Sequence, residues 1–204
     1  MSALLAKPDS DRLFEVAESQ QGYFSTPQAI AAGYARSTHS YHVHAGNWVR
    51  EHRGVYRLLR YPRSEEGQLV LWSLWSRNRE GKPQGVYSHL TALSIEELSD
   101  ANPAKLHMTV PPDFRRSGEV PAILRLYKAQ LARDEIIEKH GYAVTTPMRA
   151  ILDLTTSGEA DRDFIIQALR EGQSRGLITR AQAAAACARS DIPTWLRHLM
   201  EPRT

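Results

Sequence analysis

The fold of the N-terminal region is decided by residues 24–58, FSTPQAIAAGYARSTHSYHVHAGNWVREHRGVYRL. Near the start of this stretch, Thr26 is a favourable helix N-cap and Pro27 suits the first helical position. The helix over residues 28–32 is short because Gly33, which adopts left-handed backbone angles easily, ends it. The stretch therefore opens with a short, well-capped helix.

Two more helices are predicted around this one. Ser37 can cap a helix over residues 38–45, and Gly46 ends it. Upstream, residues 11–18 place apolar side chains on one helical face, with a cap among the polar residues 9–11. The second and third helices are joined across a glycine-containing turn, which is the pattern of a helix-turn-helix.

A β-hairpin is predicted directly after the third helix. Residues 48–51 and 55–58 are β-prone, and the His52-Arg53-Gly54 segment between them is typical of a hairpin turn. Three helices followed by a hairpin describe a winged helix. In that layout the third helix enters the major groove of DNA and the wing lies along the backbone or minor groove.

The positive charge of the chain is confined to the same region. The 204 residues carry a formal net charge of only +3. Residues 34–64, however, hold six arginines and one glutamate, which gives a local charge of +5. Residues 1–33 sum to −2 and residues 65–204 sum to zero. A basic segment of this kind points to a polyanion as its partner, while the neutral remainder is better assigned to protein partners.

The candidate DNA-binding residues are the polar and basic side chains of the third helix and the hairpin. They are Arg36, Ser37, Thr38, His39, Ser40, His42, His44, Arg50, His52, Arg53 and Arg57. We expect Tyr41 and Ala45, four residues apart, to face the core, so that His39 and its polar neighbours face outward toward base edges and phosphates. Arg50, Arg53 and Arg57 are expected to neutralise phosphates. The alternatives are a merely solvated helix face and a sheet edge protected by arginines.

The order of these residues resembles the winged-helix domain of AbiEi-type antitoxins, the transcriptional regulators of type IV toxin–antitoxin systems. The similar motifs are residues 24–29, 33–38, 52–58, 87–93, 105–111 and 144–154, within a resemblance that covers most of residues 11–156. The resemblance implies a bifunctional protein. Its winged helix represses its own operon, often by cooperative binding to inverted repeats in the promoter, and its C-terminal domain counters a nucleotidyltransferase-like toxin.

The whole chain is predicted to be an α+β protein. Residues 1–63 form a winged helix-turn-helix, and residues 64–204 form a mixed α/β C-terminal domain that mediates protein interaction, ends in small helices and can self-associate on DNA. Its predicted strands cover residues 85–87, 105–110, 123–127 and 138–144. Its predicted helices cover residues 65–76, 88–95, 161–172, 179–188 and 194–200, together with one that begins at Pro147.

Composition and motifs weigh against other classes of protein. One cysteine excludes a disulfide scaffold, and the absence of a long apolar run or signal-peptide pattern predicts a cytoplasmic protein with no membrane partner. No catalytic residue, metal site or cofactor is predicted. Two alternatives stay open, a protein-binding winged helix and a winged-helix-targeted, metal-dependent nuclease. The nuclease would use carboxylates among Asp113, Glu119, Asp134, Glu135 and Glu138, although Lys139 directly follows Glu138, so the E-x-K spacing is missing.

Overall fold

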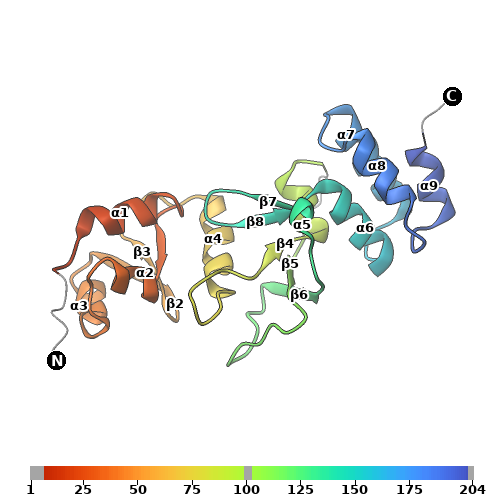
Figure 1. Cartoon of the computed structure of the whole chain (residues 1–204). Helices are drawn as coiled ribbons and strands as arrows, with labels where there is room; N and C mark the ends of the chain where they lie inside the picture. Colours follow the sequence, from red (N-terminus) through yellow and green to blue (C-terminus); the bar gives the residue numbers. More distant parts are fainter. Residues whose placement is uncertain (1–6, 99–102, 202–204) are drawn as a thin grey trace. The chain divides into compact units, whose positions relative to one another are not determined.

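The computed structural model describes residues 7–98 and 103–201, which fall into two compact units (Figure 1). The N-terminal unit comprises Met1–Gly85 together with Glu138–Ala143, and the C-terminal unit comprises Val86–Ile137 and Val144–Thr204. Each unit mixes helices with a small sheet, which confirms the predicted α+β class. Within the described ranges, no helix is both long and apolar enough to cross a bilayer.

The N-terminal unit is a winged helix-turn-helix, as predicted. Its elements are α1 (Ser10–Glu18), β1 (Tyr23–Ser25), α2 (Thr26–Ala31), the 3-10 turn η1 (Arg36–Thr38), α3 (His39–His44), β2 (Trp48–His52), β3 (Val55–Leu58) and α4 (Glu65–Trp75). The three strands form an antiparallel sheet in the order β1-β3-β2. β1 is not among the predicted strands, because three residues before a helix carry no alternating pattern of their own.

Local side-chain contacts explain where the first two helices begin. Asp9 caps α1 by accepting a 2.9 Å hydrogen bond from the backbone N–H of Arg12. At α2 the cap is Ser25, one residue earlier than predicted, and its N–H donates to Oε1 of Gln28 at 2.7 Å. Pro27 lies in the first turn, as expected.

The core of this unit is aromatic. The buried residues of the cluster are Leu13, Ala17, Phe24, Ala29, Ala32, Tyr34, Trp48 and Tyr56. Phe24 meets Trp48 edge to face with ring centroids 5.0 Å apart, and it stacks on Tyr56 at 5.8 Å. The strand register pairs Phe24 with Tyr56, so the sheet itself brings these two rings together. The helices and the wing therefore share one rigid core.

The N-terminal unit extends beyond residue 63, where the sequence places the domain boundary. α4 packs against all three strands, and Gly67 lies so close to the ring of Tyr23 that an added Cβ would be 2.9 Å from it. Beyond α4, the Arg77 guanidinium donates to the carbonyl oxygens of Leu74 and Gly54, the latter in the turn of the wing, at 2.6 and 3.0 Å. α4 thus packs against the sheet, and the loop after it is hydrogen-bonded to the turn of the wing.

The C-terminal unit contains a five-stranded sheet. Its strands are β4 (Val86–Tyr87), β5 (Leu106–Val110), β6 (Leu124–Lys128), β7 (Ile136–Glu138) and β8 (Ala143–Thr145), in the order β6-β5-β4-β8-β7. Its helical elements are α5 (His89–Ile95), η2 (Arg133–Glu135), α6 (Pro147–Ser157), α7 (Arg162–Ser174), α8 (Arg180–Cys187) and α9 (Thr194–Met200). The predicted helices are confirmed to within a few residues.

One predicted strand of this sheet is wrong. Residues 138–144 were expected to form a single strand, but the chain reverses between β7 and β8. The N–H of Lys139 donates to the carbonyl oxygen of Tyr142 at 2.9 Å, and Gly141 takes a φ of +89° in the turn. A side chain at Gly141 would also meet Val70 at 3.0 Å, so this tight reversal requires glycine twice over. The alternation seen in the sequence spans two short strands and a turn.

Candidate nucleic-acid interface

The face of α3 that points outward differs from the predicted one. Tyr41, expected in the core, has a relative exposure of 66%, and Ala45 is exposed as well. His39, expected to face outward, is only 3% exposed, and its Nε2–H donates to the carbonyl oxygen of Tyr34 at 3.1 Å. Its ring contacts Trp48 and Tyr56 edge to face, at 5.3 and 5.5 Å between centroids. The outward orientation of His39 was therefore a wrong prediction.

The third helix also begins one residue later than predicted. The predicted helix begins at Thr38, whereas the chain forms the 3-10 turn η1 first and α3 begins at His39. At 3.6 residues per turn, His39 and Tyr41 lie about 200° apart around the helix axis, so the packing of His39 against Trp48 and Tyr56 turns Tyr41 outward. The imidazole of His39 is therefore part of the aromatic core.

The exposed face of η1 and α3 carries hydrogen-bonding groups at helical spacing. Ser37, Ser40, Tyr41 and His44 are exposed, three or four residues apart, and so lie along one side. The Nδ1–H of His44 donates to the carbonyl oxygen of Ser40 at 2.7 Å, and the rest of this side chain is exposed. Thr38, also exposed, uses its hydroxyl proton on the carbonyl oxygen of Ala35 at 2.8 Å. This face thus presents polar groups suited to base edges.

His42 supports this face instead of belonging to it. Its ring is half-buried and stacks on Trp48 with centroids 4.6 Å apart. Its Nδ1 accepts a hydrogen bond from the side-chain amide of Asn47 at 3.3 Å. Burial lowers the pKa of His42 from 6.5, and the neighbouring His39 lowers it further. We therefore expect a neutral, packed ring at this position.

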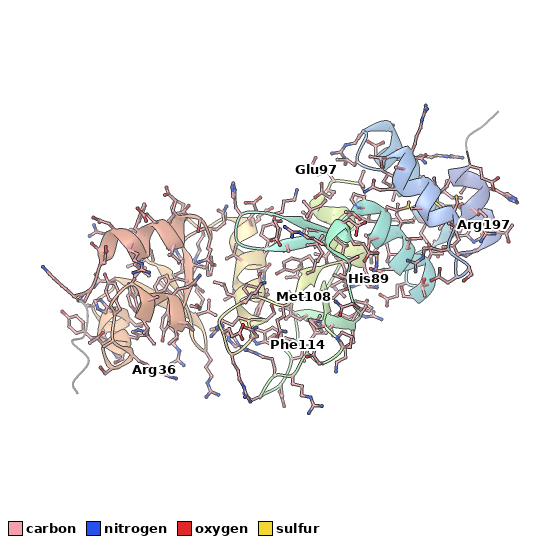
Figure 2. The ribbon with its side chains drawn as sticks, in the orientation of Figure 1. Arg36, His89, Glu97, Met108, Phe114 and Arg197 are labelled. Carbon is pink, nitrogen blue, oxygen red and sulfur yellow. The ribbon has the colours of Figure 1, made fainter. Side chains whose placement is uncertain are left out.

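The wing presents two arginines to solvent. Arg50 on β2 and Arg53 in the turn are exposed. Gly54 takes a φ of +72°, which closes the turn after Arg53. The side chain of Arg36 also lies on the outside of this unit, beside α3 (Figure 2). Across the described part of the chain, none of these three arginines forms an ion pair. Their charge is available to an external anion.

Arg57, the third predicted phosphate ligand of the wing, is buried. It is 3% exposed, and its Nε donates to Oε1 of Glu51 at 2.9 Å. Its Nη1 donates to the carbonyl oxygens of Leu58 and Tyr61 at 3.2 and 2.8 Å. β3 is buried at three successive residues, Val55, Tyr56 and Arg57, so both of its faces are covered there. The prediction for Arg57 was wrong because the sequence shows its charge but not its partner.

His52 is turned toward α4. Its ring is half-buried and lies 5.6 Å from the ring of Trp72, edge to face. The bulge in the pairing of β2 with β3 falls between Arg50 and His52, and it changes which side chains face outward. Of the predicted contacts on the hairpin, Arg50 and Arg53 are therefore the exposed ones.

The carboxylates of the nuclease alternative do not form a metal site in the described segments. Glu135 pairs with Arg149 at 2.6 Å and also accepts from the N–H of Ala132. Arg149 bridges further to Asp153 at 2.8 Å. In the part of the chain that the structure describes, no three His, Cys, Asp or Glu side chains come together as metal ligands. The Glu135–Arg149–Asp153 group joins η2 to α6.

The C-terminal unit contains a buried polar network that the sequence did not reveal. Thr109 donates to Ser88 Oγ at 2.8 Å, and Ser88 in turn lies 2.9 Å from Nδ1 of His89. The ring of His89 stacks on Tyr127 with centroids 3.7 Å apart. The phenol of Tyr127 donates to Glu159 at 2.6 Å. His89 takes a φ of +54°, a left-handed conformation that costs energy for a residue with a side chain.

Because His89 is buried in this network, we expect the protein to lose stability in acid. Burial, with a smaller contribution from His107, lowers the pKa of His89 from 6.5 to about 4. Between pH 6.5 and 4, His89 binds a proton in the unfolded chain but not in the folded chain. The free energy of unfolding therefore falls as the pH drops from 6.5 toward 4. The expected loss from His89 is about 3 kcal/mol. Urea unfolding at a series of pH values measures it.

The matched variants for this measurement are His89→Asn and His140→Gln. Asparagine tolerates left-handed backbone angles and does not titrate, so His89→Asn should flatten the acid limb of the profile. His140 is exposed, and its replacement should leave the profile as it is in the wild-type chain. An unchanged acid limb in His89→Asn would assign the effect to other groups.

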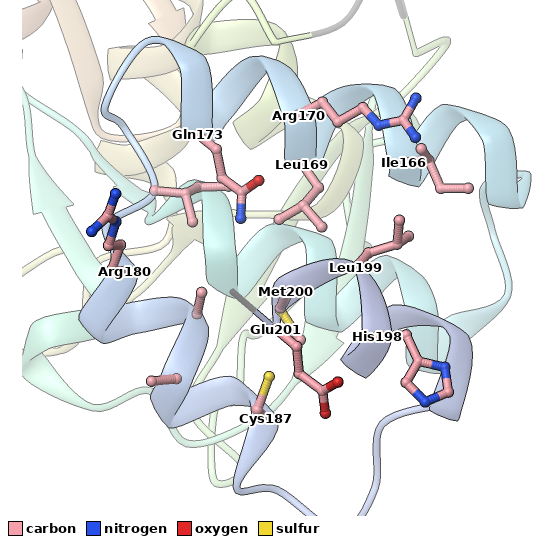
Figure 3. Close-up of a pocket in the computed structure, with 13 residues that line it drawn as sticks. Ile166, Leu169, Arg170, Gln173, Arg180, Cys187, His198, Leu199, Met200 and Glu201 are labelled. Atoms are coloured by element: carbon pink, nitrogen blue, oxygen red, sulfur yellow. The ribbon is translucent and has the colours of Figure 1, made fainter. Parts of the chain in front are cut away.

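The last three helices line an open cavity of about 1120 Å³ (Figure 3). Leu169, Ile178 and Met200 contribute aliphatic walls, and Arg170 and Arg180 add two cationic side chains. The Sγ of Cys187, which also lines this cavity, lies 3.8 Å from the carbonyl oxygen of Arg197. The cavity belongs to the C-terminal unit alone and involves none of the predicted DNA-binding residues.

Two comparisons with known proteins bear on these surfaces. Residues 11–59 match the model of a family described as transcriptional regulator, AbiEi antitoxin. This match runs from α1 to the end of the wing and stops before α4, and it confirms the resemblance for that segment. The chain is also 25% identical over 209 residues to the DNA replication and repair protein RecF of Magnetococcus marinus. That alignment includes 96% of this chain but only 53% of the RecF protein, so the chain spans about half of its length.

Proposed function

We propose that this chain is a DNA-binding transcriptional autorepressor and the antitoxin of a type IV toxin–antitoxin system. The observation that carries the proposal is the exposed polar and basic face of η1, α3 and the wing, which lies within the segment matched to the regulator family. The partial similarity to a protein named for DNA replication and repair also points to DNA as a ligand.

In this proposal α3 enters the major groove and the wing holds the backbone. Ser40 and His44 present hydrogen-bonding groups to base edges, and Ser37 and Thr38 lie where the helix would meet a phosphate. Arg36, with Arg50 and Arg53 of the wing, supplies positive charge for phosphates, since none of the three forms an ion pair among the described residues. Two protomers on an inverted repeat would place their recognition helices about 34 Å apart, one turn of DNA.

The test is a mobility-shift titration of the full chain against the DNA directly upstream of its own coding sequence. We expect a discrete complex whose affinity falls steeply with salt, because each neutralised phosphate releases a counterion. An unrelated duplex of equal length and composition is the control. Equal affinity for the two duplexes, or an affinity independent of salt, would contradict the proposal.

The third helix should carry the sequence preference. Ser40→Ala and His44→Ala are expected to reduce the preference for the upstream DNA over the control duplex by about tenfold each, because each loses one hydrogen bond to a base edge, worth about 1.4 kcal/mol. Binding to the control duplex should hardly change. Competition titrations measure the ratio of the two affinities. Thr194→Ala, on the exposed surface of α9, is the matched control.

The antitoxin part of the proposal is tested separately, in cells. Co-expression of the full chain should restore growth to cells that express a nucleotidyltransferase-like toxin encoded beside it. The C-terminal unit is assigned this role because it has no concentration of basic charge. An Arg50→Ala, Arg53→Ala variant should therefore still restore growth. Loss of rescue in that variant would mean that DNA binding and toxin neutralisation are not separable.

A further inference from the structure

Tyr41 is the large apolar side chain with the greatest exposure among the described residues. Its relative exposure is 66%, against 46–49% for Phe14, Ile30, Leu59 and Val120. An aromatic ring held in water gives up the free energy of burial that the same ring would gain in the core. Tyr41 also lies in the middle of the exposed face of α3, between Ser37 and His44. Tyr41 therefore lies where a bound DNA would contact it.

The ring of Tyr41 contacts the core through its neighbour His42. It meets the ring of His42 edge to face at 5.4 Å between centroids, and His42 stacks on Trp48 at 4.6 Å. Trp48 is 4% exposed and belongs to the aromatic cluster of the winged helix. This chain of three rings links a surface side chain to the rigid core. A side chain ordered before binding loses less conformational entropy when it meets a partner.

The chemistry of the major groove limits what such a ring can recognise. Base edges there present hydrogen-bond donors and acceptors, and one apolar group, the 5-methyl of thymine. The neighbours of Tyr41 on the exposed face, Ser37, Ser40 and His44, are polar and suit the donors and acceptors. Tyr41 supplies the largest apolar surface of this face, which otherwise offers the smaller methyl group of Ala45.

We propose that Tyr41 reads the methyl group of a thymine in each half-site of the DNA target. This inference rests on the proposed function and adds a specificity-determining residue to it. The phenyl ring makes the contact with the methyl group, while the hydroxyl points past it to water or to a phosphate. Thymine at that position is then preferred over uracil and over cytosine.

The experiment uses duplexes selected by the wild-type chain from a random-sequence pool. Each thymine of the selected site is replaced in turn by uracil, which lacks the methyl group and keeps every hydrogen-bonding atom. The wild-type chain should lose about fourfold in affinity at one thymine per half-site, the value of one buried methyl group. Tyr41→Ala should bind more weakly and show no loss at that position. Tyr41→Phe should keep the fourfold difference, because it keeps the ring.

Phe14→Ala is the matched control, since Phe14 is an exposed aromatic residue on α1, away from the recognition face. It should show the full uracil effect. Failure of the wild-type chain to retain or select DNA would overturn the proposed function itself. Selection of a defined site with no uracil effect, or an unchanged uracil effect in Tyr41→Ala, would overturn the assignment of Tyr41 alone.

Discussion

An Arg50→Ala, Arg53→Ala double variant should bind DNA about a hundredfold more weakly than the wild-type chain, whatever the DNA sequence. Both guanidinium groups are exposed on the wing and form no ion pair among the residues that the structure describes. A hydrogen bond between charged groups contributes about 1.5 kcal/mol, so the loss of two amounts to about 3 kcal/mol. The slope of log affinity against log salt should also fall by about two units per protomer.

The control for this variant is Arg12→Ala, Arg79→Ala. Both of these arginines are exposed in the N-terminal unit, and both lie outside the basic segment of residues 34–64. The control removes the same net charge from other places, so a large effect in it would indicate a general attraction between the protein and DNA. Titrations at several salt concentrations distinguish the two cases. An unchanged salt slope in the wing variant would show that the wing does not touch the backbone.

Arg57→Ala should act on stability, with an expected loss of about 3 kcal/mol in the free energy of unfolding of the N-terminal unit. The substitution leaves Glu51, which is 18% exposed, without the 2.9 Å contact to the Arg57 guanidinium. It also removes donors from two backbone carbonyls at the end of the wing. Urea unfolding followed by the fluorescence of the chain, in which Trp48 reports on this core, gives the measurement.

A double variant separates the ion pair from a direct role in DNA binding. Arg57→Met with Glu51→Gln removes both charges together, and it should recover much of the stability that Arg57→Ala loses. At temperatures where each variant is folded, DNA affinity should stay close to that of the wild-type chain. A salt slope reduced by one unit in a fully folded Arg57→Ala protein would instead return Arg57 to the set of phosphate contacts.

Local signals were sufficient for most of the elements. The proline in the first turn of α2, the turn at residues 52–54 and the helix that begins at Pro147 all depend on residues within a few positions of one another. Such signals can be read in a sequence because their physical causes are local. The reversal at Gly141 was missed because its two strands are only three residues long.

The same distinction between local and tertiary causes applies to the candidate site. The sequence alone determined that a helix-turn-helix with a wing comes first and that the positive charge is confined to residues 34–64. Only the tertiary structure decided which of those side chains reach the surface. His39 is drawn inward by Trp48 and Tyr56, and Arg57 is neutralised by Glu51. Charge and periodicity can be read from the order of the residues. The exposure of a side chain depends on which face of a helix packs against the core and on which other side chains folding brings next to it.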